Sequence, residues 1–366
     1  MLRGRSSWIF LVAINLTAIS CAHTARPPAP RAPAAQLPQE EVLILISDTL
    51  RIDTTYHSME GPYHITRFTI ASAEQPDTVW ITGMTADVVG ADLTPVPVEF
   101  FCHANLDYDP LVHHELFNTN RMTSSRLFTL SQGHEAMRFP EGFGIPVRTD
   151  EPLYLTSQVL SNNGVDAVKD VRVRIRVHYV RNGERPMKAL YLTSAIGAVS
   201  TDGHSGHYGM HDDHEVGAST AGVAKGRHEY RDTLGQRFAG HWIVPPGEHR
   251  VRTVVTRWLN LDADARVHYV GVHVHPFAQR ITLRDMTTGE EVFSSRVTPL
   301  EGRVGISKVT DLSSSEGVRL YADHHYELIS DYSNPTARDV DAMAVMFLYV
   351  RDGQLRALES RTRQSQ

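Results

Sequence analysis

Apolar and polar residues alternate with a period of two along many short stretches of this chain, and this pattern is typical of β-strands. The clearest example is Val171–Val180, in which aliphatic residues alternate with arginines. Because successive side chains of a strand point to opposite faces, this segment has one face in a core and one face in water. His178 lies on the arginine face by this count, so we expect its side chain to be solvated.

Similar patterns recur from residue 41 to residue 352, and no long stretch shows a helical period. Each short run is bounded by Gly, Pro, Asp or Asn, as strands are. Many short strands with turns between them predict an all-β protein built from antiparallel β-sandwiches. A polar break at 182–186 suggests two domains, 41–187 and 188–352. The predicted strands are 63–70, 78–82, 85–89, 98–103, 153–160, 171–180, 189–196, 237–244, 249–257, 266–275, 280–285, 319–330 and 342–350.

The first 21 residues have the pattern of a lipoprotein signal peptide. Two early arginines precede the apolar run Trp8–Leu16, which is too short to span a bilayer. Ala18–Cys21 then resembles a lipobox, with Cys21 as the residue that carries lipid after cleavage. The sequence therefore predicts a bacterial cell-envelope protein, anchored by lipid in the periplasm or outer membrane, with plain secretion as the alternative.

Polar or proline-rich segments flank the predicted domains. Residues 22–40 are rich in Pro and Ala and are expected to form a semi-extended tether. Residues 353–366 are expected to form a polar tail.

Charge and cysteine content narrow the function classes. Lys and Arg number 36 against 42 Asp and Glu, and no basic patch is apparent, so we expect no nucleic-acid partner. We expect a monomer. The chain has only two cysteines, Cys21 and Cys102. If Cys21 carries lipid, no internal disulfide can form, and stability must come from the core or from a metal. The 20 histidines are many for this length, and they cluster.

The histidines at the end of the predicted strand 266–275 form the strongest candidate site. His273 and His275 are two residues apart, so they share a strand face at about 7 Å spacing. Two neighbouring imidazoles on one face suit a first-row transition metal. The alternative is a pair of hydrogen-bonded histidines at a strand end.

Three further groups carry potential metal ligands. Cys102 and His103 end one predicted strand, His113 and His114 follow a short loop, and Met343 begins the predicted strand 342–350. The stretch 203–215 has the composition of a flexible metal-collecting loop, and a solvated polar insertion is the alternative. Its potential ligands are His204, His207, Met210, His211 and His214.

Taken in order, these segments resemble the copper type II ascorbate-dependent monooxygenases, the family of peptidylglycine α-hydroxylating monooxygenase and dopamine β-monooxygenase. The resemblance is patchy and spans most of residues 78–350. It rests on the motif His273-Val274-His275, on Met343 in a later strand, and on the segments 139–145, 152–159 and 245–249.

The resemblance implies two jelly-roll-like sandwich domains, each holding one copper ion, with a cleft between them. His273, His275 and Met343 would bind the second-domain copper. Imidazoles suit both oxidation states of copper, and a thioether favours Cu(I). The implied reaction is hydroxylation of a C–H bond with O₂, with electrons from ascorbate or another reductant. The implied substrate is a small molecule or a peptide whose identity the sequence does not determine.

The first-domain copper site departs from the family pattern. Its third histidine would fall at Leu160, which cannot bind copper. The remaining pair is Cys102-His103 by position or His113-His114 by identity. A thiolate can replace an imidazole for Cu(I), whereas a buried cysteine can also act as a small apolar residue. This site is therefore altered or lost.

The substrate-binding residues of the peptide-amidating members are also replaced. Gly271 and Phe347 stand where those members have an arginine and a tyrosine that hold the substrate carboxylate. We therefore do not expect peptide amidation.

Three hypotheses for function follow. The first is an exported copper-binding protein with a mononuclear His₂Met site, whose catalysis as a monooxygenase is left open. The second is a non-catalytic envelope lipoprotein that sequesters or delivers copper. The third is a metal-free β-sandwich lipoprotein of the cell surface that is structural or binds glycans. The two-sandwich architecture also resembles that of bacterial peptide N-glycanases, which use acidic residues and no copper.

Overall fold

The computed structural model describes residues 40–56, 60–71, 75–119, 124–201, 229–231, 235, 237–356 and 358. Within them almost all regular structure is strand, so the predicted all-β class is confirmed. The described helices are α1 (Pro110–Phe117), the single turn α2 (Thr256–Leu259) and the 3₁₀ turn η1 (Val98–Phe100), and none of them is long and apolar enough to cross a membrane. The predicted signal peptide with Cys21 and the loop 203–215 lie outside the described residues.

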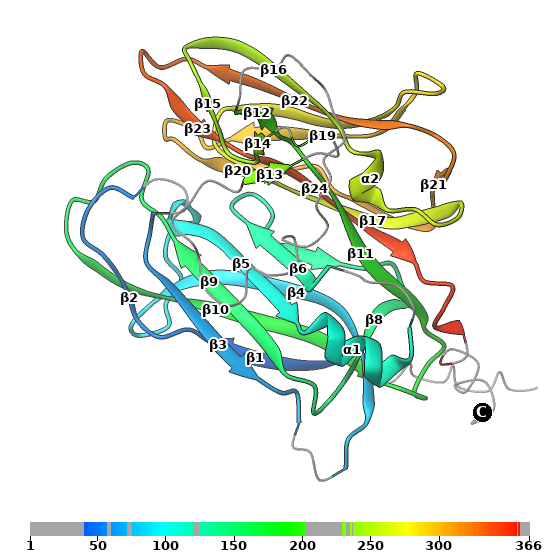
Figure 1. Cartoon of the computed structure of the whole chain (residues 1–366). Coiled ribbons are helices and arrows are strands. Elements are labelled where there is room, and N and C mark those ends of the chain that lie inside the picture. Colours follow the sequence, from blue (N-terminus) through cyan, green and yellow to red (C-terminus); the bar gives the residue numbers. More distant parts are fainter. Residues whose placement is uncertain are drawn as a thin grey trace, which may run out of the picture. The chain divides into compact units, whose positions relative to one another are not determined.

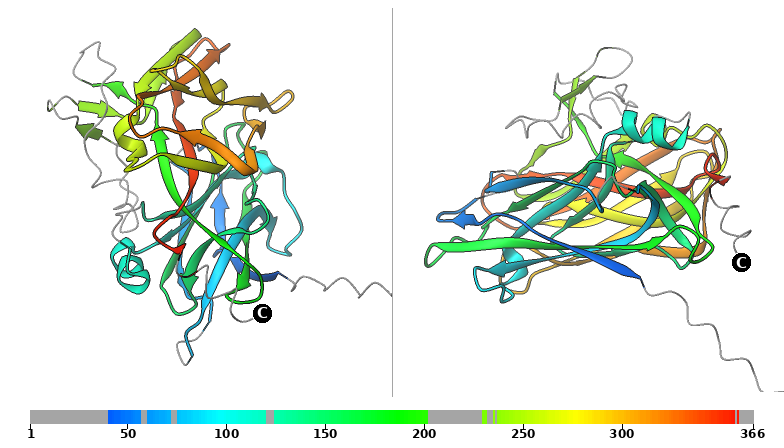
Figure 2. Two further views of the ribbon diagram at one scale, coloured as in Figure 1. Left: turned by 90° about the vertical axis from the view of Figure 1, so that its right-hand side faces the viewer. Right: turned by 90° about the horizontal axis from the view of Figure 1, so that it is seen from below.

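A ten-stranded sheet runs through the whole described unit (Figures 1 and 2). Neighbouring strands within this sheet are antiparallel, except β8 and β11, which pair in parallel. Strands from before residue 188 form one end of this sheet, and later strands form the other end. In order across the sheet the strands are β1 (Glu41–Ile46), β10 (Lys169–Arg181), β4 (Thr78–Gly90), β8 (Phe143–Arg148), β11 (Lys188–Ile196), β24 (Ala344–Arg351), β17 (Ala265–Val274) and β21 (Leu312–Leu320), with β2 (Leu50–Ile52) beside β10 and β7 (Ala136–Arg138) beside β4.

Two smaller sheets pack against the ends of the ten-stranded sheet and complete the sandwiches (Figure 1). The pairing of β8 with β11 joins strands from before and after residue 188 in one sheet. The predicted division into two domains at 187/188 stays a prediction. The four-stranded sheet has the order β3 (Tyr63–Phe68), β9 (Leu153–Val159), β5 (Phe101–Tyr108) and β6 (Arg126–Ser131). The five-stranded sheet has the order β16 (Gly247–Val254), β22 (Tyr326–Asn334), β18 (Ala278–Asp285), β19 (Glu291–Pro299) and β20 (Ile306–Val309). Short strands form two further pairings: β12 (Val199–Ser200), β14 (Arg237–Ala239) and β13 (Glu229–Arg231), and β15 (Trp242–Val244) with β23 (Val340–Ala342).

The alternating segment of β10 behaves as its pattern predicts, except at one residue. Its aliphatic side chains are buried and its arginines are partly exposed. The pairing with β4 shifts register between His178 and Tyr179, where Thr82 of β4 is the extra residue, so the alternation along β10 itself continues. His178 is buried, and its Nδ1 accepts a hydrogen bond from Arg138. The expectation of a solvated His178 is therefore wrong.

Two predicted strands form one, and a glycine inside it allows a neighbouring strand to approach. The segments 78–82 and 85–89 are continuous as β4, with Gly83 inside it. A Cβ atom at Gly83 would lie 2.4 Å from the carbonyl oxygen of Met137, so glycine lets β7 approach closely. Elsewhere predicted strands are divided: 319–330 into β21 and β22, and 342–350 at Met343.

Buried apolar side chains from before and after residue 188, the two halves of the chain, form one continuous cluster. At its centre Phe139 contacts the rings of Tyr269 and Tyr349, and the Tyr349 hydroxyl donates to the backbone oxygen of Leu127 at 2.9 Å. Part of the predicted polar tail also packs, because Leu355 is buried in a small cluster that includes Trp80.

The core predicts a large difference between two leucines of the first half. Leu106 is fully buried on β5, whereas Leu111 on α1 is 64% exposed. We expect Leu106→Ala to lower the free energy of unfolding by about 2–5 kcal/mol because it leaves a cavity. We expect Leu111→Ala to change it by less than about 0.5 kcal/mol. Urea denaturation of both variants checks this, and similar losses in both would contradict the described packing.

Candidate metal centre

Four histidine rings from three separate parts of the chain form a row in which each ring contacts the next. We call them the histidine cluster. His273 and His275 come from the end of β17, with ring centroids 5.5 Å apart. His103 of β5 lies 6.1 Å from His273. His241, just before β15, lies 5.4 Å from His275. The structure thus brings the two predicted histidines of β17 together with one predicted and one unpredicted partner.

The position of the β17 histidines follows from the pleat of a central strand. β17 lies between β24 and β21, and both histidines point to the same face, 8% and 3% exposed. The turn after His275 contains Pro276, then Phe277 at φ 73°, and the Ala278 N–H donates to the His275 oxygen. A proline followed by a positive φ is typical of a type II turn. A bulky residue in that conformation is strained, and such strain persists where surrounding packing enforces it.

A β-bulge places Cys102 beside His103. The pairing of β5 with β9 shifts register between Phe101 and His103, so the side chains of two adjacent residues can lie on one side. The Cys102 Sγ lies 3.2 Å from the His103 Nδ1, and both residues are buried. Of the two candidate remnants in the first half, the structure places Cys102-His103 beside the histidines of β17.

The other candidate pair occupies α1, beyond the opposite end of β5. His113 lies with its Nδ1 2.9 Å from the Glu151 carboxylate and its ring against Tyr108, while His114 Nδ1 contacts the Thr119 hydroxyl at 3.4 Å. The β5 residues between His103 and Tyr108 alone span about 16 Å. The described contacts of His113 and His114 therefore belong to local packing and not to the histidine cluster.

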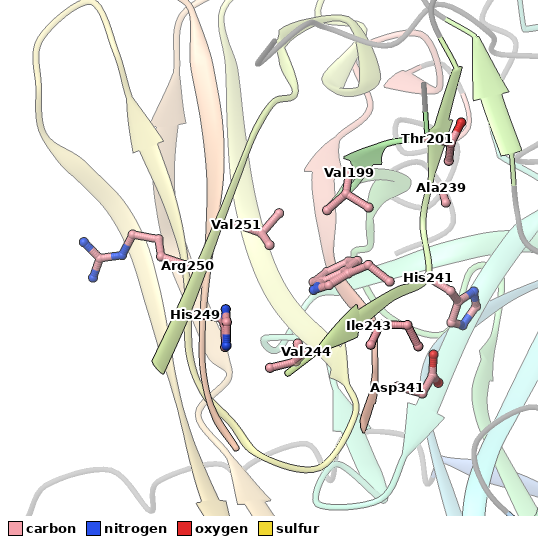
Figure 3. Close-up of a pocket in the computed structure, with 11 residues that line it drawn as sticks. Val199, Thr201, Ala239, His241, Ile243, Val244, His249, Arg250, Val251 and Asp341 are labelled. Atoms are coloured by element: carbon pink, nitrogen blue, oxygen red, sulfur yellow. The ribbon is translucent and has the colours of Figure 1, made fainter. Parts of the chain in front are cut away.

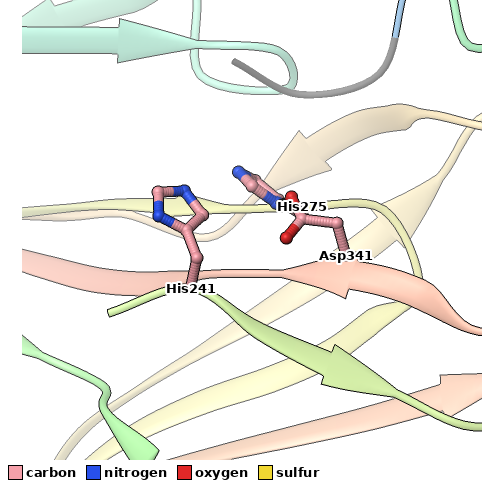
Figure 4. Close-up of side chains that lie close together, drawn as sticks. All are labelled: His241, His275 and Asp341. Atoms are coloured by element: carbon pink, nitrogen blue, oxygen red, sulfur yellow. Dashed lines mark ion pairs between the residues drawn. The ribbon is translucent and has the colours of Figure 1, made fainter. Parts of the chain in front are cut away.

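His241, His275 and Asp341 form the tightest group of potential ligands, and we call it the outer site. Their ligand atoms all lie within 4.8 Å of one another. The His275 Nδ1 lies 2.8 Å from Asp341 Oδ2, yet this nitrogen has no partner in hydrogen-bond geometry (Figure 4). His241 is half-buried and the Asp341 side chain is 36% exposed, so the outer site is reached from solvent.

Met343 lies beside the outer site by strand register. The His275 N–H donates to the Met343 oxygen at 3.3 Å, and the Tyr332 hydroxyl donates to the same oxygen at 2.6 Å. On the other side, Trp242 pairs with Ala342 at the end of the β15–β23 ladder, and His241 and Met343 are the chain neighbours of this last pair. Directly opposed residues of antiparallel strands share a face. The predicted role of the Met343 sulfur as a ligand stays a prediction.

Burial keeps the imidazoles of the inner part of the cluster uncharged. Burial lowers the pKa of His103 to about 3, with a further contribution from the Arg126 charge. Burial likewise holds the pKa of His273 well below its usual value. Neutral imidazole is the form that binds metals. The His273 Nδ1 is buried and has no hydrogen-bond partner among the described residues. Because such a group is costly to leave unpaired, a metal ion there would be stabilising.

A pocket of about 440 Å³ adjoins the outer site (Figure 3). His241 and Asp341 line it together with Trp242, His249 and Val251. A metal ion at the outer site would therefore border a space that accommodates a small molecule.

Sequence reasoning missed His241 and Asp341. Asp341 lies two residues before Met343, and this spacing alone could have suggested a shared face. His241 precedes a short strand and has no partner at a recognisable spacing. Its role depends on how β15 pairs with β23, which is a tertiary property.

A second buried network links the halves next to the histidine cluster. The Tyr269 hydroxyl donates to Asp311 at 2.7 Å and lies 2.9 Å from the His134 Nε2. A Cβ at Gly271 would lie 2.6 Å from the His134 ring, so glycine provides the space for this histidine. Gly271, where the resemblance would place a substrate-binding arginine, thus leaves the space that His134 fills.

Comparisons with known proteins do not identify a family. No protein-family model matches the chain, and no curated protein matches its sequence. Structural matches include the STIV MCP, with a TM-score of 0.33, 8% identity and coverage of 88% of this chain and 99% of that one. Another is a peptide-N(4)-(N-acetyl-beta-D-glucosaminyl) asparagine amidase, with a TM-score of 0.30, 9% identity and coverage of 84% and 96%. These similarities are too distant to bear on function.

The buried His134 predicts acid sensitivity. Burial lowers its pKa to about 4, below the unfolded value of 6.5. Between these pH values the unfolded chain binds a proton that the folded chain does not, so stability falls as pH falls. We expect His134→Gln to reduce this slope by roughly 1.4 kcal/mol per pH unit.

Urea denaturation of the metal-free protein at pH 7, 6 and 5 measures the slope. His325→Ala is the matched control, because His325 is exposed. Equal slopes in wild type and His134→Gln would contradict the prediction.

Proposed function

We propose that this protein binds copper at the outer site, through His241, His275 and Asp341, with the Met343 thioether as a further ligand. The convergence of the three polar donors within 4.8 Å is the observation that carries the proposal. Ligated metals lie about 2.0–2.2 Å from such donors, so small side-chain movements would complete the site. This assignment replaces His273 of the sequence prediction by His241 and adds Asp341.

The donor set favours copper over other ions. Two imidazoles and a carboxylate bind divalent first-row metals, and Cu²⁺ lies at the maximum of the usual affinity order. A thioether is a soft donor that adds affinity for Cu(I). Such a mixed set would retain copper in both oxidation states, as a protein that captures copper outside the cytoplasm requires.

In this proposal the protein is an envelope lipoprotein that sequesters or delivers copper. The predicted lipid anchor at Cys21 and the tether 22–40 would hold the domain near a membrane, and the predicted loop 203–215 would collect metal. The outer site's access to solvent supports exchange of the ion.

Oxygen-dependent hydroxylation, as in the copper type II ascorbate-dependent monooxygenases, is the second candidate. The pocket beside His241 and Asp341 favours it, because a substrate there would lie next to the metal. When bound, copper would supply the O₂ chemistry, and ascorbate would supply electrons. The chain's own residues would bind and orient the substrate against the apolar wall that includes Trp242 and Val251.

Ligand removal tests the outer site. We expect His275→Ala and Asp341→Asn each to weaken Zn(II) and Cu(II) binding by at least about 10–100-fold, the loss typical of removing even an outer-shell partner. His325→Ala, an exposed histidine on the loop before β22, should leave both affinities unchanged. Isothermal titration with each metal measures this.

Met343→Leu separates the thioether from the other donors in the same experiment. It should weaken Cu(I) binding at the outer site while leaving Zn(II) binding unchanged. If wild type binds neither metal, the proposed function is wrong. If Asp341→Asn binds as tightly as wild type, the metal lies elsewhere.

Oxygen consumption separates the two candidates. If copper handling is the function, the copper-loaded wild type should consume O₂ with ascorbate no faster than the same amount of copper in protein-free buffer. A rate that depends on His275 and rises with an added organic substrate would instead establish the monooxygenase candidate. An oxygen electrode with wild type and His275→Ala gives the comparison.

A further inference from the structure

We propose that Cys102, His103 and His273 form a second metal site, the inner site, which binds monovalent copper with ligands from both halves of the chain. The proposal rests on the proposed copper-binding function and goes beyond it. The inner site would bind a separate ion through residues that the outer site does not use. The histidine pair at the end of β17 would contribute one ligand to each site.

The donor geometry fits one shared ion. The Cys102 Sγ and the His103 Nδ1 lie 3.2 Å apart, held together by the bulge in β5. A metal about 2.1 Å from an imidazole nitrogen lies about 3 Å from the ring centre, so two rings that share an ion have centres within about 6 Å. The centroids of His103 and His273 lie 6.1 Å apart with the rings nearly perpendicular. This separation lies at the upper limit for a shared ion, so binding of one ion would draw the two rings closer together.

An unpaired nitrogen gives the second, independent indication. The His273 Nδ1 is buried and has no hydrogen-bond partner among the described residues. Buried polar side chains of native proteins are almost always paired with protein, water or an ion. His275 and His103 are the rings that contact His273, so the unpaired imidazole lies within the histidine cluster.

Charge and burial select the ion. The three donors are between 5% and 8% exposed, and only the thiol can become an anion. A thiolate with Cu(I) is neutral, whereas a divalent ion would leave a net positive charge in a desolvated place, which is costly. The nearby Arg126 charge is already paired with Asp107. The soft thiolate also prefers Cu(I).

The two sites would therefore differ in their preference among metal ions, although the Met343 thioether lets the outer site hold Cu(I) as well. The outer site contains a carboxylate and reaches solvent, which suits Cu(II) or Zn(II). The inner site contains a thiol and is buried, which suits Cu(I). Binding there replaces the S–H bond by an S–Cu bond, and the proton leaves to solvent. No change of oxidation state is part of this step.

A thiolate-specific signal tests the inner site. Anaerobic titration of the full chain with Cu(I) should produce the near-ultraviolet absorption of a Cu(I)–thiolate bond, and this absorption should saturate. Cys102→Ser should abolish this absorption and retain Zn(II) binding at the outer site. Cys21→Ser is the matched control, because Cys21 is the chain's other cysteine, and it should keep the absorption. His273→Ala should weaken Cu(I) binding by at least about tenfold.

The outcomes separate the two proposals. An absorption that persists in Cys102→Ser, or that is absent in a wild type that still binds Zn(II), overturns the inner site alone. A wild type that binds no metal overturns the outer site as well. If Cys102→Ser does not fold, the wild type itself gives the answer. Cu(I) should slow alkylation of Cys102 by at least about tenfold if the thiolate is a ligand, and an unchanged rate would overturn the proposal.

Discussion

One face of β17 packs against the first half of the protein, and the rest of the candidate metal centre depends on this contact. Tyr269, Gly271, His273 and His275 lie two residues apart and share that face. Each except His275 meets a residue from before position 188: His134 lies beside Tyr269 and Gly271, and His103 contacts His273. A single strand thus supplies a hydrogen-bonded anchor at one end and candidate metal ligands at the other.

Burial of this face explains the chemistry of the cluster. Imidazoles that are removed from water lose their affinity for protons, so His103 and His273 remain neutral and able to bind metal. The same desolvation makes an unpaired nitrogen or an uncompensated charge expensive. Toward solvent, Asp341 can balance a divalent ion, whereas among the proposed inner-site donors only the Cys102 thiol can supply a negative charge. In our proposals, the exposed outer site therefore prefers a divalent ion, and the buried inner site prefers a monovalent one.

Local patterns in the sequence predicted those features of the structure that depend only on residues close together in the chain. The all-β class follows from the period of two, and the shared face of His273 and His275 follows from their spacing. The patterns failed where residues from other parts of the chain cover a side chain, or where a bulge interrupts the period of a strand. His178 is buried because Arg138 and Glu40, from outside β10, contact it, whereas at Cys102 a bulge brings two adjacent side chains together.

The sequence by itself therefore determined the fold class and the strand that carries the histidines, since both are encoded in periodicity within a few residues. Only the tertiary structure decided which donors meet them. His241 and Asp341 reach His275 through the pairing of β15 with β23, and His103 reaches His273 through packing between the halves. These contacts join residues separated by more than 30 positions. No local pattern specifies such pairings, because they depend on strand order and register across whole sheets.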